Sequence, residues 1–178
     1  MRLIFKILIF LLINLNVFAD DIKEFEINEM SIGDSALKYY SENQIKSSKQ
    51  NWYKGKKYST SARDGIQFSY KTKDNEYILA EISKVDTMDI SKCLNELTPL
   101  ADNIASLFSK KIRRNGPTIK KHWADKSKKS FIHRYKFTFP NNDYIAVECY
   151  DWSKNVSWDD HLRVRIVTNK FEKFLQKQ

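Results

Sequence analysis

Residues 131–153 read FIHRYKFTFPNNDYIAVECYDWS, and this stretch decides the fold that we expect for the chain. Aromatic and apolar residues alternate with polar ones up to Phe139, which is typical of a strand with one buried face. The residues PNND have turn chemistry, and the alternation resumes after them. Ile145, Val147 and Cys149 then share one face of the returning strand. The stretch therefore predicts an antiparallel hairpin that turns Cys149 toward the core.

Further strand patterns extend this hairpin into a sheet. Residues 66–82 read as a second hairpin, with the turn residues KTKDNE between two alternating runs. The stretch HLRVRIV at 161–167 predicts one more strand, whose Leu162, Val164 and Ile166 face inward. We therefore expect an antiparallel sheet of about five strands.

The stretch MDISKCLNELTPLADNIASLFSKKI, from residue 88 onward, predicts a long helix. Asp89 is a good N-cap, and Pro99 is expected to kink the helix or split it in two. One apolar stripe follows helical spacing; it contains Ile90, Cys93, Leu94, Leu97, Ala101, Ile104, Leu107 and Phe108.

Shorter helices are expected near both ends of the chain. Ser31 and Asp34 have capping-box spacing and predict a helix over about 33–46. The stretch TNKFEKFLQK predicts a last helix that Asn169 caps. The order of elements predicts an α+β domain, with the long kinked helix and the shorter helices packed on one face of the sheet.

Residues 1–19 have the composition of a secretory signal peptide. Two basic residues precede an apolar run, and small Val17 and Ala19 occupy the positions that a signal peptidase favours. The alternative, an uncleaved anchor, needs about 20 apolar residues, and this run is shorter. We expect a signal peptide at 1–19, one α+β domain at 20–178, no later transmembrane segment and a periplasmic or secreted location.

The chain has two cysteines, Cys93 and Cys149, and each lies on the inferred core face of its element. Disulfides persist in oxidising compartments, and two cysteines permit only one intramolecular pairing. We therefore expect a structural disulfide between them. The bridge would close a loop of 57 residues. The alternative is two buried free thiols. Because there is no Cys-x-x-Cys motif and no metal-ligand spacing, we predict neither a metal nor a cofactor.

The excess positive charge is concentrated in one segment. The chain has 31 basic and 22 acidic residues, but KKIRRNGPTIKKHWADKSKKS at 110–130 holds nine basic residues and only one acidic residue, Asp125. Such a basic loop suits an anionic envelope component: a lipid headgroup, an acidic glycan or a phosphorylated ligand. The alternative is a solvated loop after a helix. No nucleic-acid module is recognisable. The candidate anion-binding residues are Lys120, Lys121, Lys128 and Lys129.

The sequence contains only weak signs of a catalytic site. Ser35 lies in a GDS triplet similar to the nucleophile block of GDSL-type esterases, but the Asp-x-x-His pair of those enzymes is missing, and a serine beside a helix start is more often a cap. The histidines, at 122, 133 and 161, have no metal-ligand spacing. We therefore expect a non-enzymatic periplasmic protein, with a small periplasmic hydrolase as the alternative.

The second strand of the opening hairpin carries aromatic residues on its other face. Tyr144 and Tyr150 flank Glu148 there, and Trp152 comes next along the chain. An exposed aromatic strip with one carboxylate would be a binding surface. The alternative is that these residues belong to the core or lie scattered on the surface.

Four stretches together resemble an uncharacterised family of small secreted (periplasmic) proteins of marine alphaproteobacteria: SIGDSALKYYSENQI, HWADKSKKS, CYDWS and DHLRVRI. The family has HPADKSGKS where this chain has residues 122–130, so Trp123 stands in place of Pro and Lys128 in place of Gly. The resemblance implies export and no particular activity. SIGDSALKYY alone is also similar to the first-helix segment of the small lipoprotein of the outer-membrane barrel-assembly machinery.

Overall fold

The computed structural model describes residues 21–50, 52, 57–108 and 111–177. The expected signal peptide at 1–19 lies outside these residues. Within them, no helix is both long and apolar enough to cross a membrane.

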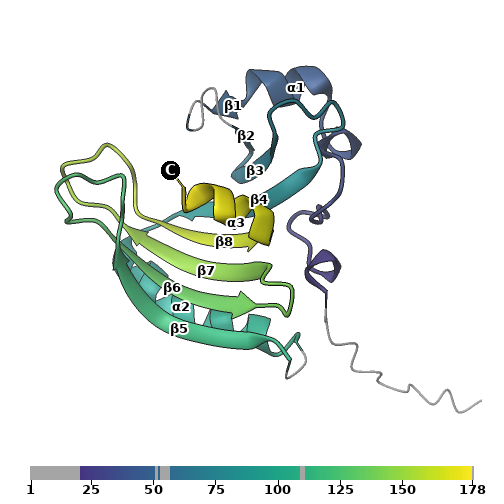
Figure 1. Cartoon of the computed structure of the whole chain (residues 1–178). Coiled ribbons are helices and arrows are strands. Elements are labelled where there is room, and N and C mark those ends of the chain that lie inside the picture. The colour runs from purple at the N-terminus through teal and green to yellow at the C-terminus, as the bar shows by residue number, and fades with distance from the viewer. Residues whose placement is uncertain (1–20, 51, 53–56, 109–110, 178) are drawn as a thin grey trace, which may run out of the picture.

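The described strands form one eight-stranded antiparallel sheet (Figure 1), in the order β1-β2-β3-β4-β8-β7-β6-β5. Neighbours in the chain are neighbours in the sheet except where β8 pairs with β4 and so joins the two halves. The strands are β1 Lys49–Gln50, β2 Tyr58–Arg63, β3 Ile66–Lys71, β4 Leu79–Thr87, β5 Arg113–Lys121, β6 Phe131–Thr138, β7 Tyr144–Asp151 and β8 His161–Val167.

The helices are short. The longest one described, α2, has 16 residues. The α-helices are α1 Glu42–Ser47, α2 Ile90–Ala105 and α3 Asn169–Leu175, and the 3-10 turns are η1 Ile22–Glu24 and η2 Ala36–Lys38.

The prediction of about five strands with a long kinked helix is wrong. Both predicted hairpins form, as β3–β4 and β6–β7, and β8 follows where HLRVRIV predicted it. The strands not counted are those with little apolar alternation. In particular, β5 is exposed along its whole length, so it has no buried face to leave a pattern in the sequence.

The predicted apolar stripe of the long helix is only partly buried. Asp89 caps α2 as expected, its side chain accepting a hydrogen bond from Ser91 N, but the helix ends at Ala105. Leu107 therefore lies beyond it and is exposed. Pro99 lies inside this single helix on its exposed side, where water can solvate the carbonyl that lacks a proline N–H partner. The stripe residues that α2 buries are Cys93, Leu97, Ala101 and Ile104.

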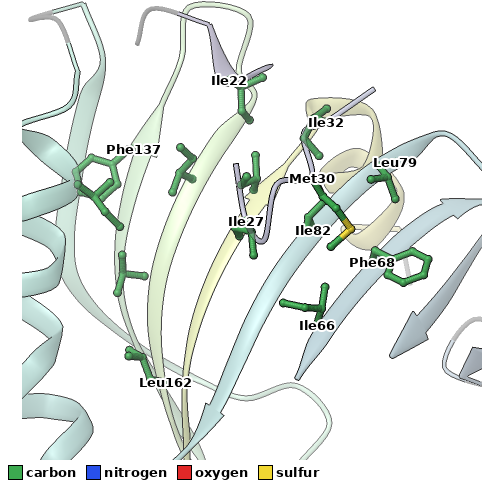
Figure 2. Packing of buried hydrophobic residues seen from close by; sticks show 14 of the residues in the cluster. Ile22, Ile27, Met30, Ile32, Ile66, Phe68, Leu79, Ile82, Phe137 and Leu162 are labelled. Atoms are coloured by element: carbon green, nitrogen blue, oxygen red, sulfur yellow. The ribbon is translucent and has the colours of Figure 1, made fainter. Parts of the chain in front are cut away.

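The main core lies on the face of the sheet that α2 covers. Ile145, Val147 and Cys149 of β7 point into it, as predicted. The chain before β1 also packs on this face, and Figure 2 shows its Ile27 and Met30 lying over the sheet beside Ile82. Burial of apolar side chains by α2 and by this segment stabilises the sheet from the same side.

The predicted helix over about 33–46 is also wrong. Asp34 does accept a hydrogen bond from Ser31 N, but this closes a turn rather than a helix N-terminus. The chain then makes η2 and only later α1, whose capping box is formed by Ser41 and Gln44. The short elements let Ser35 pair with Ile78 in a bridge that attaches the segment to the sheet.

The last helix lies on the opposite face from α2, so the prediction that all helices share one face is wrong. Phe171 of α3 packs with Tyr58, Tyr144 and Val167 in a second, smaller core. Figure 1 shows α3 in front of the sheet and α2 behind it. The N-cap of α3 is Thr168 rather than the predicted Asn169.

The predicted disulfide is confirmed. Cys93 of α2 and Cys149 of β7 are bridged, with their Cα atoms 5.8 Å apart and both residues fully buried. The bridge fastens α2 to a central strand of the sheet, as the two apolar patterns predicted.

Candidate anion-binding surface

The strand β5 forms one edge of the sheet, and it pairs with β6 alone among the described strands. Its register shifts between Asn115 and Thr118, and the Gly116–Pro117 peptide bond between them is cis. At Gly116 φ is +123°, and an added Cβ atom would lie 2.5 Å from Arg134 O, so only glycine fits there. Pro117 has no N–H to donate, which suits a strand whose outer side pairs with no other described strand.

The predicted basic residues gather at one end of this edge. Lys120 and Lys121 end β5, and Lys128 and Lys129 lie in the loop that returns to β6. The structure therefore brings all four into one hairpin. Together with Lys126 of the same loop they form a surface that we call the basic edge: Lys120, Lys121, Lys126, Lys128 and Lys129. All five are exposed, and none makes an ion pair with another described residue.

Arg114 differs from the residues of the basic edge because it is held by the fold. Its Nη2 atom lies 2.7 Å from Oδ1 of Asp102 on α2. Its guanidinium group also stacks over the ring of Tyr135, 4.6 Å from the centroid. Arg114 thus fastens β5 to the helix layer and leaves its neighbours to face solvent.

Asp125, the acidic residue of this segment, is buried inside the loop. Its two oxygens accept six hydrogen bonds of 2.8–3.1 Å, from Ser127 N and Oγ, Lys129 N, Ser130 N and Oγ, and Ser153 Oγ. The bond from the Ser127 hydroxyl contributes most to holding the pKa of Asp125 well below its usual range, with burial opposing it. Because these donors occupy the carboxylate, it does not pair with the lysine ammonium groups around it.

The loop makes a tight turn at Lys128. Lys128 has φ +60°, a left-handed conformation that glycine adopts without strain. Its N–H donates a 3.0 Å hydrogen bond to Asp125 O, and His122 N donates a 2.9 Å bond to Ser130 O across the base of the loop. The side chain of Lys128 is therefore presented from a fixed backbone.

An aromatic cluster adjoins the basic edge at the same end of the sheet; it consists of His122, Tyr150, Trp152, Trp158 and His161. The ring centroid of Trp152 lies 4.3 Å from that of His122 and 4.6 Å from that of Trp158. The rings of Tyr150 and His161 are stacked at 4.5 Å. Burial lowers the pKa of His122 to about 4 and also lowers the pKa of His161, so both imidazoles are neutral near pH 7.

A buried ionic network covers the face of the sheet opposite α2. Glu148 is fully buried; its Oε1 lies 2.5 Å from Arg134 Nε, and its Oε2 accepts a 2.9 Å hydrogen bond from the Tyr150 hydroxyl. Burial alone would raise the pKa of Glu148, but the guanidinium groups of Arg134, Arg165 and Arg163 outweigh it and keep the pKa well below its usual range. Tyr144, Glu148 and Tyr150 are thus interior and Trp152 is half-buried, so these residues form no exposed aromatic strip and most of them belong to the core, the alternative that the sequence left open.

The network continues across the sheet through a second carboxylate. Glu81 Oε1 lies 2.8 Å from Arg163 Nη2 and 3.8 Å from Arg165 Nε, and Glu81 Oε2 accepts a 2.9 Å bond from Ser69 Oγ. Arg165 Nη1 also lies 4.0 Å from Glu148 Oε2, so it links the two carboxylates. This network was not predicted from the sequence, although the alternation in HLRVRIV places Arg163 and Arg165 on the face opposite Leu162.

The candidate catalytic residues are not brought together. The Ser35 hydroxyl accepts a hydrogen bond from Leu37 N and donates one to Glu76 O, so it is a helix cap. His161 Nδ1 lies 2.8 Å from Asp159 O, and His122 Nδ1 accepts from Ala124 N. Across the described ranges, no serine hydroxyl is hydrogen-bonded to a histidine ring, and no cluster of metal-ligating side chains is found.

Comparison of the chain with protein-family models, with curated proteins and with solved structures gives no match. The resemblance to secreted alphaproteobacterial proteins therefore stays a prediction, and the functional inference depends on the geometry of the basic edge.

Proposed function

We propose that the chain is a non-enzymatic periplasmic protein that binds an anionic component of the cell envelope through its basic edge. The observation that carries this proposal is that the exposed cations are unpaired while the carboxylate among them is buried. Five exposed cations are free of ion pairs with described residues, whereas Asp125 in their midst is buried and fully hydrogen-bonded. Exposed unpaired cations attract anionic ligands through long-range electrostatics.

The disulfide supports the proposed compartment. Bridges of this kind persist in the periplasm and outside the cell and are rare in the cytosol. The Cys93–Cys149 bridge is buried between α2 and β7, which suits a structural role in an oxidising environment.

Two anionic probes test the proposal: vesicles of phosphatidylglycerol with phosphatidylcholine, and soluble dextran sulfate. The test variant replaces Lys120, Lys121, Lys128 and Lys129 with Gln. Each lysine near an anionic bilayer contributes about 1 kcal/mol to binding, so the loss of these four is expected to weaken vesicle binding by about a thousandfold. Binding of the parent protein is expected to fall steeply with added salt.

A control variant of equal charge separates a local effect from net charge. It carries Gln at four exposed lysines outside the basic edge: Lys71, Lys73, Lys170 and Lys173. Retained binding by the control with loss in the basic-edge variant supports the proposal. Equal binding by the two variants, or no binding of the parent to either probe, would overturn it.

A further inference from the structure

The most exposed large apolar side chain described is Trp123, and it lies in the loop of the basic edge. Its relative exposure is 83%, against 51% for Trp158 and 52% for Trp52. Lys121 precedes it by two residues, and Lys126 follows it by three. An indole placed in water among cations costs solvation free energy, and the fold gains no core packing from it.

The loop holds this indole in a defined position. The backbone is closed by the His122–Ser130 hydrogen bond and fastened by the six bonds to Asp125. The ring of Trp123 stacks on that of His122, with centroids 5.7 Å apart, and His122 in turn packs on Trp152. A rigid loop gives up little conformational entropy when it binds, which favours a contact made through its tip.

A second partly exposed indole lies on the adjacent loop. Figure 1 shows the β5–β6 and β7–β8 loops side by side at one end of the sheet. Ser153 N and Oγ bond to Ser130 and Asp125 across them. Trp158 belongs to the β7–β8 loop and packs on Trp152, so this end of the molecule presents indoles and cations together.

The combination of side chains favours a lipid bilayer over a soluble polymer. Indoles partition into the interface of a membrane because the ring is apolar and its N–H is polar, and lysines around them are drawn to anionic headgroups. A carbohydrate site would instead place amides or carboxylates beside the ring. The one carboxylate of the β5–β6 loop, that of Asp125, is buried and hydrogen-bonded, so none is presented beside Trp123 in its own loop. The exposed Asp159 follows Trp158 on the other loop.

We infer that Trp123 inserts into the interfacial region of an anionic lipid bilayer while the basic edge contacts its headgroups. The inference rests on the proposed function and specifies the envelope component as the membrane surface itself. It makes the protein a peripheral membrane binder whose loop end faces the bilayer.

Tryptophan fluorescence on vesicles tests the insertion. The purified protein is mixed with phosphatidylglycerol–phosphatidylcholine vesicles whose acyl chains carry bromine, which quenches indoles at the membrane interface. We expect quenching in the parent protein, loss of most of it in Trp123→Ala, and vesicle binding about tenfold weaker in that variant. The matched control is Trp52→Ala, an exposed indole outside the loop, which is expected to leave quenching by the vesicles and affinity unchanged.

Dextran sulfate separates failure of the insertion from failure of anion binding. Trp123→Ala is expected to bind dextran sulfate as the parent does and to keep the parent melting temperature, because the side chain is exposed. If the parent binds dextran sulfate but not vesicles, or if vesicle quenching is the same in Trp123→Ala, membrane insertion is overturned and anion binding stands. If the parent binds neither probe, both are overturned.

Discussion

The hydroxyl of Ser153, just beyond β7, donates a 3.1 Å hydrogen bond to Oδ2 of Asp125 in the β5–β6 loop. Ser153 N also donates to Ser130 Oγ at 3.0 Å. Two loops that are separated in the sequence are therefore fixed to each other, and the cations of the basic edge are carried on a closed structure rather than on a free loop.

We predict that Asp125→Asn lowers the melting temperature by several degrees and weakens anion binding. Oδ2 accepts five of the six hydrogen bonds and Oδ1 accepts the one from Ser127 N. An amide therefore either sets its N–H donors against Ser127 N or removes the acceptor of the other five bonds, and in both cases the remaining bonds lose the negative charge that strengthens them. Thermal unfolding and vesicle binding measure the two effects. The matched control, Asp159→Asn, removes the same charge at an exposed site. Tighter binding by Asp125→Asn than by the parent would show that net charge, not loop geometry, governs the interaction.

His122 is predicted to make stability fall in mild acid. Burial is the main reason that its pKa is about 4 in the folded chain, against 6.5 ordinarily; Arg163 and His161 act in the same direction, while Glu148 and Asp125 oppose it. As the pH falls from 6.5 to 4, the unfolded chain takes up a proton that the folded chain does not, so the free energy of unfolding decreases over this window and is fully restored above it.

Denaturant unfolding at pH 7 and pH 5 checks this dependence on His122. The free energy of unfolding falls between pH 7 and pH 5 in the parent. In His122→Gln this fall is expected to be smaller by about 1 kcal/mol, after allowance for solvent screening. Part of the decrease should persist, because burial lowers the pKa of His161 as well. An identical decrease in parent and variant would contradict the assignment.

Loss of the disulfide is predicted to cost roughly 4 kcal/mol of unfolding free energy. The bridge joins residues 56 positions apart, and closing such a loop removes entropy from the unfolded chain. Denaturant unfolding of the parent with Cys93→Ala/Cys149→Ala measures the loss. The reduced parent serves as the control and is expected to resemble the double variant. A loss below about 1 kcal/mol would contradict the loop-entropy account.

Glu148→Gln is predicted to destabilise the fold by about 3 kcal/mol, because it leaves the buried Arg165 and the partly buried Arg134 with one carboxylate fewer. Chemical denaturation provides the measurement. The comparison variant is Glu96→Gln, which breaks an exposed pair with Lys92 and is expected to change stability little. Similar losses in the two variants would indicate that the buried network contributes no more than a surface pair.

The parts of the fold that could be predicted are those in which burial leaves a periodic pattern. The β6–β7 hairpin turns alternate apolar residues toward α2, and α2 buries residues at helical spacing, so both could be located and Cys93 and Cys149 could be placed face to face. The edge strand β5 left no such pattern. It exists because its backbone pairs with β6, and backbone pairing is independent of side-chain type.

The candidate site was predictable in composition but not in geometry. The lysines of the basic loop were evident from the charge run, whereas the burial of Asp125 depends on donors from Ser153, 28 residues away. In the same way, alternation placed Glu148 and Arg163 on the face opposite the core, but their burial follows from the register of β7 against β8, which the sequence does not state.

The outer side of β5 affects whether the protein stays monomeric. A sheet of eight strands can lengthen only at its two ends, and an unpaired strand offers its backbone to any chain that matches it. At β5 a neighbouring copy would meet Pro117, a register shift and a row of like charges, each of which discourages further pairing. Neutralising these lysines therefore removes a barrier to self-assembly, so the glutamine variants should be run on a sizing column before any affinity is compared.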